Sequence, residues 1–387
     1  MNNIPKGFIF TGKNRLALFY SAVSCRTTGL FTKNLVKAAP VLVSQRKLSK
    51  FSSKIRAIIA NSGCANACTG KKGILDAEKM CNVSAKYLNL KPEHVLVAST
   101  GVIGEFLPMK KIIKGIKNLT YSLTNSPIDA VKAIMTTDTY PKFCSRKFYI
   151  DKKEVRIWAC IKGSGMIHPE LATLLCFIFT DINISKRLQN IALKDAVDRT
   201  LNCLSVDGDT STNDSVFLLS NGLAGNKIII SEKDRNFKKF YNVLNSVCEE
   251  LAKKTVTDGE GATKFIKIKI FSAKDKNSAR KIAECIATSP LVKTAIFGCD
   301  PNWGRIMAAI GRSGVKINPE KIDLFINGLC VVKNGTTTNL STEKLKRSMR
   351  RKKIDIDIFL NSGSVWLEYY TCDLSYDYVK INASYRT

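Results

Sequence analysis

Hydrophobic residues recur along the chain with two periods, one typical of helices and one typical of strands. Between 233 and 253 they recur every three to four residues, which predicts an amphipathic helix. From Lys264 to Phe271 isoleucine alternates with lysine, as in a strand with one exposed face. Further helices are predicted at 74–87 and Ala279–Ala287, and further strands at 51–60, Val95–Ala98, Val155–Ile161, Ile354–Leu360 and Val365–Tyr370, the last two as a closing pair. Because strands and helices interleave, the fold class is a layered α/β or α+β protein.

Length and composition are those of a globular protein. A chain of 387 residues can bury a large core in one or two lobes. Hydrophobic residues make up 45% and charged residues 24%, which are ordinary values. The apolar stretch Leu171–Phe179 is shorter than the about 20 residues that cross a bilayer. The first residues lack the pattern of a signal peptide, so we expect a cytoplasmic protein without a membrane partner.

The net charge of +29 is the one value that favours a different class, a nucleic-acid-binding protein. However, the basic residues form only short runs, at Arg46–Lys50, Lys110–Lys117 and Lys344–Lys353, without interleaved aromatic residues. This favours nonspecific attraction to polyanions at low salt, with no specific nucleic-acid partner. The thirteen cysteines lack zinc spacing, so we expect no metal site and free thiols in a reducing compartment.

A threonine stands out as a candidate nucleophile. The glycine-rich turn Lys162–Gly165 leads through Pro169 to Ala172 and Thr173, and an apolar run to Phe179 follows. Such a turn can bring backbone amides close to a reacting carbonyl. If the bond between Ala172 and Thr173 is cut, Thr173 gains an α-amine with a pKa of about 8, which can act as general base for its own hydroxyl. Taken alone, a threonine before an apolar run is usually just the start of a buried strand.

Other arrangements of nucleophile and base are scarce. A Ser–His–Asp triad needs a histidine held by a carboxylate, and the chain has only His94 and His168. His94 lies in a turn that enters a strand, and His168 precedes Pro169. We interpret both as solvated or locally bonded. The segment around Asp207 and Asp209 lacks the glycine and glutamate of a calcium loop, so these carboxylates are expected to organise a loop through backbone hydrogen bonds.

Eight further segments, in order and over nearly the whole chain, resemble those of the glutamate N-acetyltransferase family, also called ornithine acetyltransferases. They are residues 29–41, 61–70, 99–104, 135–139, 205–214, 258–264, 298–305 and 378–387. One such segment would be weak evidence for a resemblance, whereas eight segments in the same order are specific evidence. The resemblance implies an α/β fold of layered sheets and helices of the ornithine acetyltransferase type. It also implies self-cleavage into intertwined subunits, an α piece of 1–172 and a β piece of 173–387, assembled as two copies of each.

The resemblance further implies an activity and its residues. The reaction is acetyl transfer from N-acetylornithine to glutamate in arginine biosynthesis, by double displacement through an acetyl-Thr173 intermediate. Thr100 and Gly101 match the family's oxyanion donors. The family's substrate-binding positions are matched by Thr136, Lys162, Thr173, Glu260, Asn382 and Thr387. Thr137 stays an alternative to Thr136. No cofactor is implied, and the motifs do not decide whether acetyl-CoA is a second acetyl donor.

The chain departs from the family pattern at a few positions. Cys64 stands where asparagine is usual, which puts the geometry of its loop in question, and Cys299 stands where alanine is common. The turn Asp300–Gly304 is expected to shape the core near the site. Two rival classes stay open. One is a self-processing hydrolase such as an aminopeptidase, with water as the acceptor, and the other is a nonenzymatic basic binding protein.

Overall fold

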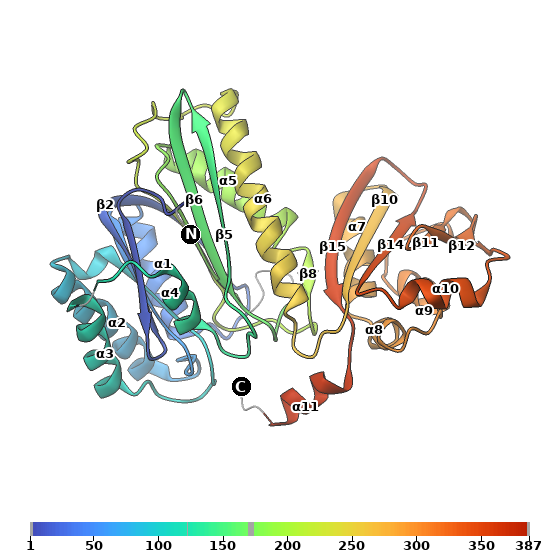
Figure 1. The fold of residues 1–387 in the computed structure, drawn as a ribbon, viewed down its shortest axis with the longest axis horizontal. Coiled ribbons are helices and arrows are strands. Elements are labelled where there is room, and N and C mark those ends of the chain that lie inside the picture. The colour runs from blue at the N-terminus through green and yellow to red at the C-terminus, as the bar shows by residue number, and fades with distance from the viewer. Residues whose placement is uncertain (1–2, 122, 169–173, 385–387) are drawn as a thin grey trace.

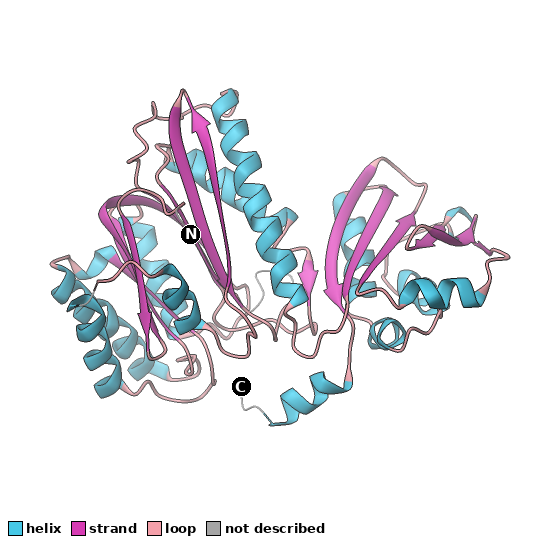
Figure 2. Ribbon diagram, viewed as in Figure 1, coloured by secondary structure: helices cyan, strands magenta, loops and turns pink. Residues whose placement is uncertain are grey.

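Two β-sheets and the helices that cover them make up the molecule, in a computed structural model that describes residues 3–121, 123–168 and 174–384 (Figures 1 and 2). The first sheet comprises β1 (Phe8–Lys13), β2 (Leu16–Phe31), β3 (Ile55–Asn61), β4 (Val95–Ser99), β5 (Lys142–Ile150), β6 (Lys153–Lys162), β7 (Leu175–Thr180) and β9 (Ser215–Ser220). The second comprises β8 (Leu204–Ser205), β10 (Phe265–Ala273), β11 (Asp323–Ile326), β12 (Leu329–Lys333), β13 (Thr336–Thr337), β14 (Lys353–Phe359) and β15 (Val365–Cys372). The predicted layered α/β class is confirmed.

Helices lie between most of the strands and at the C-terminal end. They are α1 (Ala39–Phe51), α2 (Gly70–Leu88), α3 (Met109–Tyr121), α4 (Pro127–Ile134), α5 (Lys186–Arg199), α6 (Arg235–Thr257), α7 (Lys276–Ala287), α8 (Pro290–Phe297), α9 (Gly304–Gly311), α10 (Thr342–Met349) and α11 (Tyr376–Ser384), with 3-10 turns at Pro92–His94 and Pro319–Lys321. The helices predicted at 74–87, 233–253 and 279–287 are confirmed as parts of α2, α6 and α7. The strand predicted from 51 begins only at Ile55, because α1 continues to Phe51.

The long strand β2 bends the first sheet into two halves that face each other. Its first part pairs with β3 and its last part, Arg26–Phe31, pairs with β9, with a register shift between Tyr20 and Cys25. The facing halves enclose an aromatic core in which the rings of Phe19 and Phe177 lie 5.0 Å apart. Burial of such rings contributes more per residue than any other side chain in the core.

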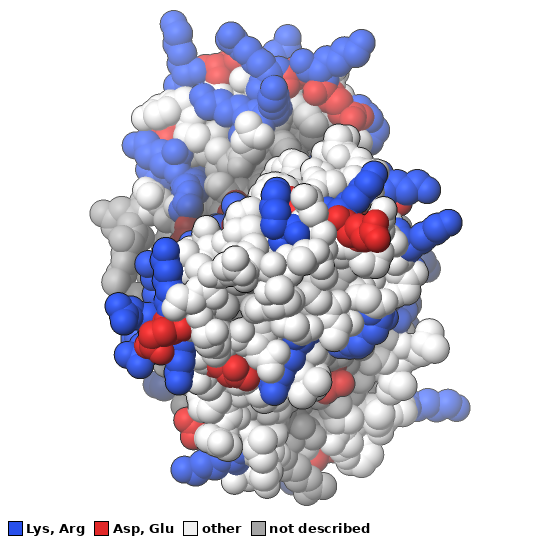
Figure 3. Space-filling model, turned by 90° about the vertical axis from the view of Figure 1, so that its right-hand side faces the viewer, with Lys and Arg blue, Asp and Glu red and all other residues white. Residues whose placement is uncertain are grey.

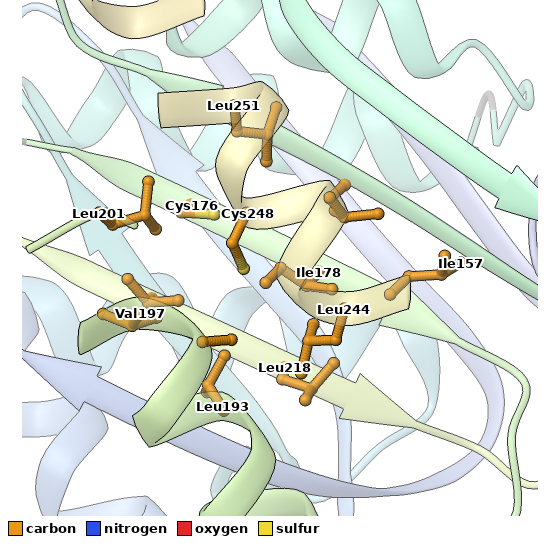
Figure 4. Packing of buried hydrophobic residues seen from close by; sticks show 14 of the residues in the cluster. Ile157, Cys176, Ile178, Leu193, Val197, Leu201, Leu218, Leu244, Cys248 and Leu251 are labelled. Carbon is orange, nitrogen blue, oxygen red and sulfur yellow. The ribbon is translucent and has the colours of Figure 1, made fainter. Parts of the chain in front are cut away.

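Helices cover both outer faces of this bent sheet, which gives four layers. On one side α2 and α3 pack over β2, β3 and β4 through residues such as Met80 and Ile112. On the other side α5 and α6 pack over β6, β7 and β9, where Leu244 and Cys248 of α6 meet Leu193 of α5 above Ile178 (Figure 4). The apolar period between 233 and 253 therefore forms the buried face of α6.

In the second sheet, β10 lies between β14 and β15. Its isoleucines are buried against α7, and its lysines lie on the opposite face, so the strand with one exposed face is confirmed. The expected closing pair of 354–360 with 365–370 is wrong in its pairing, because β14 and β15 each pair with β10. The link between them crosses the end of β10, where the backbone N–H groups of Leu360 and Ser362 bond to the carbonyls of Phe271 and Ser272.

Charged side chains are distributed over the surface. On the face in Figure 3, lysine and arginine project at many separate points, with acidic side chains between them. The basic run at Lys344–Lys353 falls on α10, the turn after it and the start of β14. Within the described ranges, no helix is long and apolar enough to cross a membrane.

Candidate active site

One edge of the first sheet gathers the candidate site residues. Strand β4 ends at Ser99, directly before Thr100, and β6 ends at Lys162. The register pairs Lys162 with Leu175 at the start of β7, and pairs Leu175 with Ser215 at the start of β9. Segments far apart in sequence therefore meet at this edge, which follows from strand direction and register.

A cavity of about 190 Å³ opens at the same edge. The predicted site residues that line it are Thr100, Gly101, Thr136, Lys162, Glu260 and Asn382. Residues that line it but were not predicted as binding residues are Asp207, Asp209, Ser211, Thr212, Asn213 and Tyr378. Three predicted residues, Ala172, Thr173 and Thr387, lie outside the described residues. The structure thus brings together every predicted site residue that it describes.

The turn after β4 presents two hydrogen-bond donors to the cavity. The backbone N–H of Thr100 is bonded to the carbonyl of Asn61 at 3.0 Å, so only the hydroxyl of Thr100 is left to donate. The N–H of Gly101 has no hydrogen-bond partner among the described residues. Gly101 has a φ of 128°, and a Cβ there would lie 2.3 Å from the carbonyl carbon of Gly63. Only glycine fits this close approach, which leaves the N–H of residue 101 at the cavity wall.

Lys162 is buried at the cavity wall, with 3% of its surface exposed. Its Nζ donates to the Oγ1 of Thr100 at 3.0 Å. Burial lowers the pKa of Lys162, and the nearby carboxylate of Asp138 acts in the opposite direction. The amine of Lys162 therefore contacts the hydroxyl of a residue that lines the cavity.

A buried charge cluster of Lys142, Asp138 and Asp258 lies beneath the site. The Nζ of Lys142 bonds to Asp138 at 2.6 Å and also to Asp258. Asp138 in turn accepts the backbone N–H of Gly163 at 2.8 Å and that of Thr136 at 3.0 Å. Burial acts to raise the pKa of Asp138, but Lys162 and Lys142 outweigh it and hold the pKa below its ordinary value. The cluster ties the Thr136 turn, the Gly163 turn and the end of α6 into one unit.

Glu260, which also lines the cavity, is held at both its backbone and its side chain. Its N–H donates to the carbonyl of Ser164 at 2.8 Å, and its Oε2 accepts from Asn382 Nδ2 at 2.9 Å. A Cβ at Gly165 would lie 2.4 Å from the Glu260 carboxylate, so a larger residue there would displace this side chain. The hydroxyl of Thr137 bonds to Ser164 at 2.6 Å, which leaves Thr136 as the threonine whose hydroxyl has no described partner.

Two carboxylates of the 207–214 loop, those of Asp207 and Asp214, bond to backbone groups, as predicted. Asp207 accepts from the N–H groups of Met166 and Ile167 at 2.5 and 2.8 Å, and burial raises its pKa to about 6. Asp214 accepts from the N–H of Leu174 at 3.0 Å, and burial raises its pKa well above the ordinary value. The second oxygen of Asp214 has no hydrogen-bond partner among the described residues.

One expectation about an individual residue needs correction. His168 is not locally bonded, because its ring nitrogens lie 3.4 Å from Ser205 Oγ and 3.2 Å from Glu284, both distant in sequence. These two contacts join the chain before 169 to β8 and α7, a relation that no local pattern could indicate. The Asp300–Gly304 turn contributes to a core, since Trp303 packs against the core of the second sheet, but the turn does not line the cavity.

The loop that contains Cys64 keeps a regular geometry. The backbone of Cys64 forms bridges with Thr100 and Val102, and its Sγ donates to the carbonyl of Glu105 at 3.2 Å. All thirteen cysteines are free thiols. Across the part of the chain that the structure describes, no group of three or more histidine, cysteine or acidic residues could hold a metal ion.

Comparison with known proteins identifies similar chains over the whole length. A model of the ArgJ family matches residues 4–387. The arginine biosynthesis bifunctional protein ArgJ of Thermotoga neapolitana is 45% identical over 396 residues, which cover 99% of this chain and 100% of the relative. The glutamate N-acetyltransferase of Methanocaldococcus jannaschii is 46% identical over 400 residues, covering 99% and 98%. The crystal structure of the ArgJ protein of Bacillus halodurans aligns with a TM-score of 0.51 at 40% identity, covering 53% of this chain and 96% of that one.

Proposed function

The chain belongs to the ArgJ family, and we propose that it transfers an acetyl group from N-acetylornithine to glutamate, giving ornithine and N-acetylglutamate in arginine biosynthesis. The observation that carries this proposal is the pair of donors at the cavity, the Thr100 hydroxyl and the Gly101 N–H. Acyl transfer passes through a tetrahedral oxyanion, and fixed donors of this kind lower its energy.

The proposed reaction is a double displacement. The α-amine of Thr173 takes the proton of the Thr173 hydroxyl while its oxygen bonds to the acetyl carbonyl carbon. The carbonyl oxygen becomes negative between Thr100 and Gly101. The C–N bond then breaks, and ornithine leaves with the proton. In the second half the amine of glutamate attacks the acetyl ester, the ester C–O bond breaks, and the proton returns to Thr173.

Cleavage between Ala172 and Thr173 must precede this chemistry, because it releases the α-amine. The strand pairing supports a cleaved yet intact molecule. In the sheet, β6 of the proposed α piece pairs with β7 of the proposed β piece, and β2 pairs with β9. Two ladders therefore hold the pieces 1–172 and 173–387 together after the bond between them is cut.

Charges around the cavity suit an amino-acid substrate. The basic side chain of Lys162 and the acidic side chains of Glu260, Asp207 and Asp209 all line the cavity. A carboxylate and an ammonium on the same substrate find opposite partners here, with charge-assisted hydrogen bonds. We assign substrate binding to Thr136, Lys162, Glu260 and Asn382, and to Thr173 and Thr387 on the resemblance alone.

The first test is the mass of the purified protein under denaturing conditions. We expect two pieces, of 172 and 215 residues, the second beginning at Thr173. The variant Thr173→Ala should stay uncut and inactive, while Thr173→Ser should cut and react slowly because it keeps a hydroxyl. An uncut wild-type chain that transfers acetyl groups would contradict the mechanism.

The second test separates transfer from hydrolysis. With N-acetylornithine and glutamate the protein should form N-acetylglutamate with ping-pong kinetics. Release of acetate at a rate that does not depend on glutamate would favour the hydrolase. A parallel assay replaces N-acetylornithine with acetyl-CoA. Formation of N-acetylglutamate there would establish a second donor, and none would restrict the enzyme to the exchange reaction.

We further propose an assembly of two α and two β pieces that works in the cytoplasm without a nucleic-acid partner. Free thiols support a reducing compartment. A native mass of one α and one β piece would contradict the assembly. Binding of DNA that persists at high salt would contradict the absence of a nucleic-acid partner.

A further inference from the structure

The hydroxyl of Thr100 has one hydrogen-bond partner among the described residues, the Nζ of Lys162 at 3.0 Å. An ammonium group can only donate, so the oxygen of Thr100 must be the acceptor in this bond. The hydrogen of the Thr100 hydroxyl then remains for another acceptor. Since Thr100 lines the cavity, an oxygen of a molecule bound there can accept this hydrogen.

We infer that Lys162 is a positioning residue for the oxyanion: it binds the oxygen of Thr100 and directs the Thr100 hydroxyl hydrogen toward the reacting carbonyl oxygen. This inference rests on the proposed acyl transfer. It gives Lys162 a role that differs from binding a substrate carboxylate, the role that the resemblance implies.

The backbone around Thr100 is already fixed, so the hydroxyl is the part that needs orientation. The N–H of Thr100 is bonded to the carbonyl of Asn61, whose side chain accepts from Ser99 Oγ at 2.6 Å and donates to the carbonyl of Cys64. Without Lys162, the hydroxyl would rotate among several positions. A donor that must reorganise during the reaction stabilises an oxyanion less than one already in place.

The surroundings of Lys162 act on its charge in both directions. Burial is the largest influence and lowers the pKa of Lys162, and Lys142 acts in the same direction, while Asp138, Asp214 and Glu260 favour the charged ammonium. A charged donor behind the hydroxyl also polarises the O–H bond, because hydrogen bonds in a chain strengthen one another. Lys162 is 3% exposed, so little water competes for its hydrogens.

A double-mutant cycle tests the inference. The variants are Thr100→Val, Lys162→Met and the combination, and kcat and KM are measured per cleaved chain, counted by denaturing mass. We expect Thr100→Val to lower kcat about 100-fold and Lys162→Met to lower it about 10- to 100-fold. In the Thr100→Val background, Lys162→Met should cost less than about threefold, since the hydroxyl that it orients is gone. In a Thr100→Ser background, which keeps a hydroxyl, Lys162→Met should again lower kcat about 10- to 100-fold.

Two results would overturn the inference. Losses in kcat that multiply in the double variant would mean that Lys162 acts independently of Thr100. A higher KM with unchanged kcat for Lys162→Met would assign Lys162 to substrate binding alone. Lys153→Met, at the exposed far end of β6, is the control and should match the wild type.

Where a variant is cut incompletely, the same cycle is scored on the cleavage half-life, because peptide cleavage also forms an oxyanion at these donors. This second readout also separates the two proposals. If the wild type transfers no acetyl group, the proposed function fails, while the coupling of Lys162 to Thr100 is still decided by cleavage.

Discussion

Lysine–aspartate pairs occur on both sheets, but in opposite surroundings. At the edge of the first sheet, the side chains of Lys142 and Asp138 meet at 2.6 Å with no exposed surface. On the open face of the second sheet, Lys267 and Asp355 meet at 3.0 Å with 18% and 31% of their side chains exposed. The residue types are the same, and the two pairs differ in how much solvent reaches their side chains.

This difference in burial distinguishes the charge cluster beneath the site from an ordinary ion pair on a protein surface. A partly exposed pair such as Lys267 and Asp355 adds little to the free energy of unfolding, because water and salt screen the attraction. A buried pair is costly to desolvate, and apolar residues of similar size could often replace it without loss of stability. The buried cluster therefore needs another reason, and its hydrogen bonds to Gly163 and Thr136 supply one, since they fix two walls of the cavity.

The largest expected effect comes from removing the buried cation. Lys142→Met leaves Asp138 and Asp258 buried without their partner, which should lower the free energy of unfolding by about 3–5 kcal/mol. Lys267→Met on the second sheet should change it by less than about 1 kcal/mol. Urea unfolding of both variants, made in the uncut Thr173→Ala chain, measures the difference. Equal losses would show that burial does not distinguish the two regions.

The next effect concerns the glycine at the oxyanion turn. Gly101→Ala keeps the N–H but places a Cβ 2.3 Å from Gly63, so the donor must move. A shift of about 1 Å at a catalytic group can lower kcat/KM about 100-fold. Gly104→Ala is the matched control, because its φ of 84° is also positive but no atom lies within 4 Å of its Cβ. If both variants lose activity equally, backbone strain rather than the close approach sets the requirement for glycine.

A third effect is the pH dependence of stability at Asp207. Burial raises its pKa from 3.8 to about 6, so the folded state holds the proton more tightly than the unfolded chain. The stabilisation is fully present below about pH 4 and is lost as the pH rises through 6. Relative to Asp207→Asn, the wild type should lose about 2–3 kcal/mol of unfolding free energy over this range.

Asp198, near the second sheet, provides a control of opposite sign. Burial acts to raise its pKa, but hydrogen bonds from Lys276 and Arg280 outweigh it and hold the pKa below the ordinary value. Its contribution should therefore be present above pH 4 and lost as the pH falls. Chemical unfolding of Asp207→Asn and Asp198→Asn from about pH 2 to 7 checks both residues, since the Asp198 contribution is lost only below about pH 4. A parallel response of the two variants would contradict the assignment.

Local patterns predicted the elements of this fold better than their pairing. The period in α6 and the alternation in β10 are properties of short segments, and both were found. The pairing of β14 and β15 with β10 depends on a link that crosses the end of β10, and hydrophobic alternation carries no information on strand order. The bend of β2, which folds the first sheet into two facing halves, was likewise not predicted.

The candidate site shows the same limit. The resemblance supplied Thr100, Gly101, Lys162 and Glu260, and all four line one cavity. It did not supply Lys142, which does not line this cavity and lies in no matched segment. A buried lysine cannot be distinguished from the many exposed lysines of so basic a chain until its neighbours are known. The carboxylates near it were the one signal in sequence, in Asp138 and Asp258 of two matched segments.

The smallest expected effect concerns the hydrogen bond between Asn382 and Glu260, which joins an exposed helix to a buried carboxylate. Asn382, on the exposed helix α11, donates to the buried Glu260 at 2.9 Å. Asn382→Ala leaves the carboxylate without this donor, and a lost hydrogen bond to a charged group is worth about 1.5–3 kcal/mol. Since water can partly replace the amide, we expect KM to rise about three- to tenfold at unchanged kcat.

The neutral variant Ser384→Ala, on the same exposed helix, is the control for Asn382→Ala and should match the wild type. Self-cleavage should proceed normally in both variants, because it depends on Thr173 and on the donors at Thr100 and Gly101. A bulky C-terminal tag should raise KM in the same direction, whereas the same tag at Met1 should not. Unchanged KM for Asn382→Ala would remove Asn382 from the substrate site.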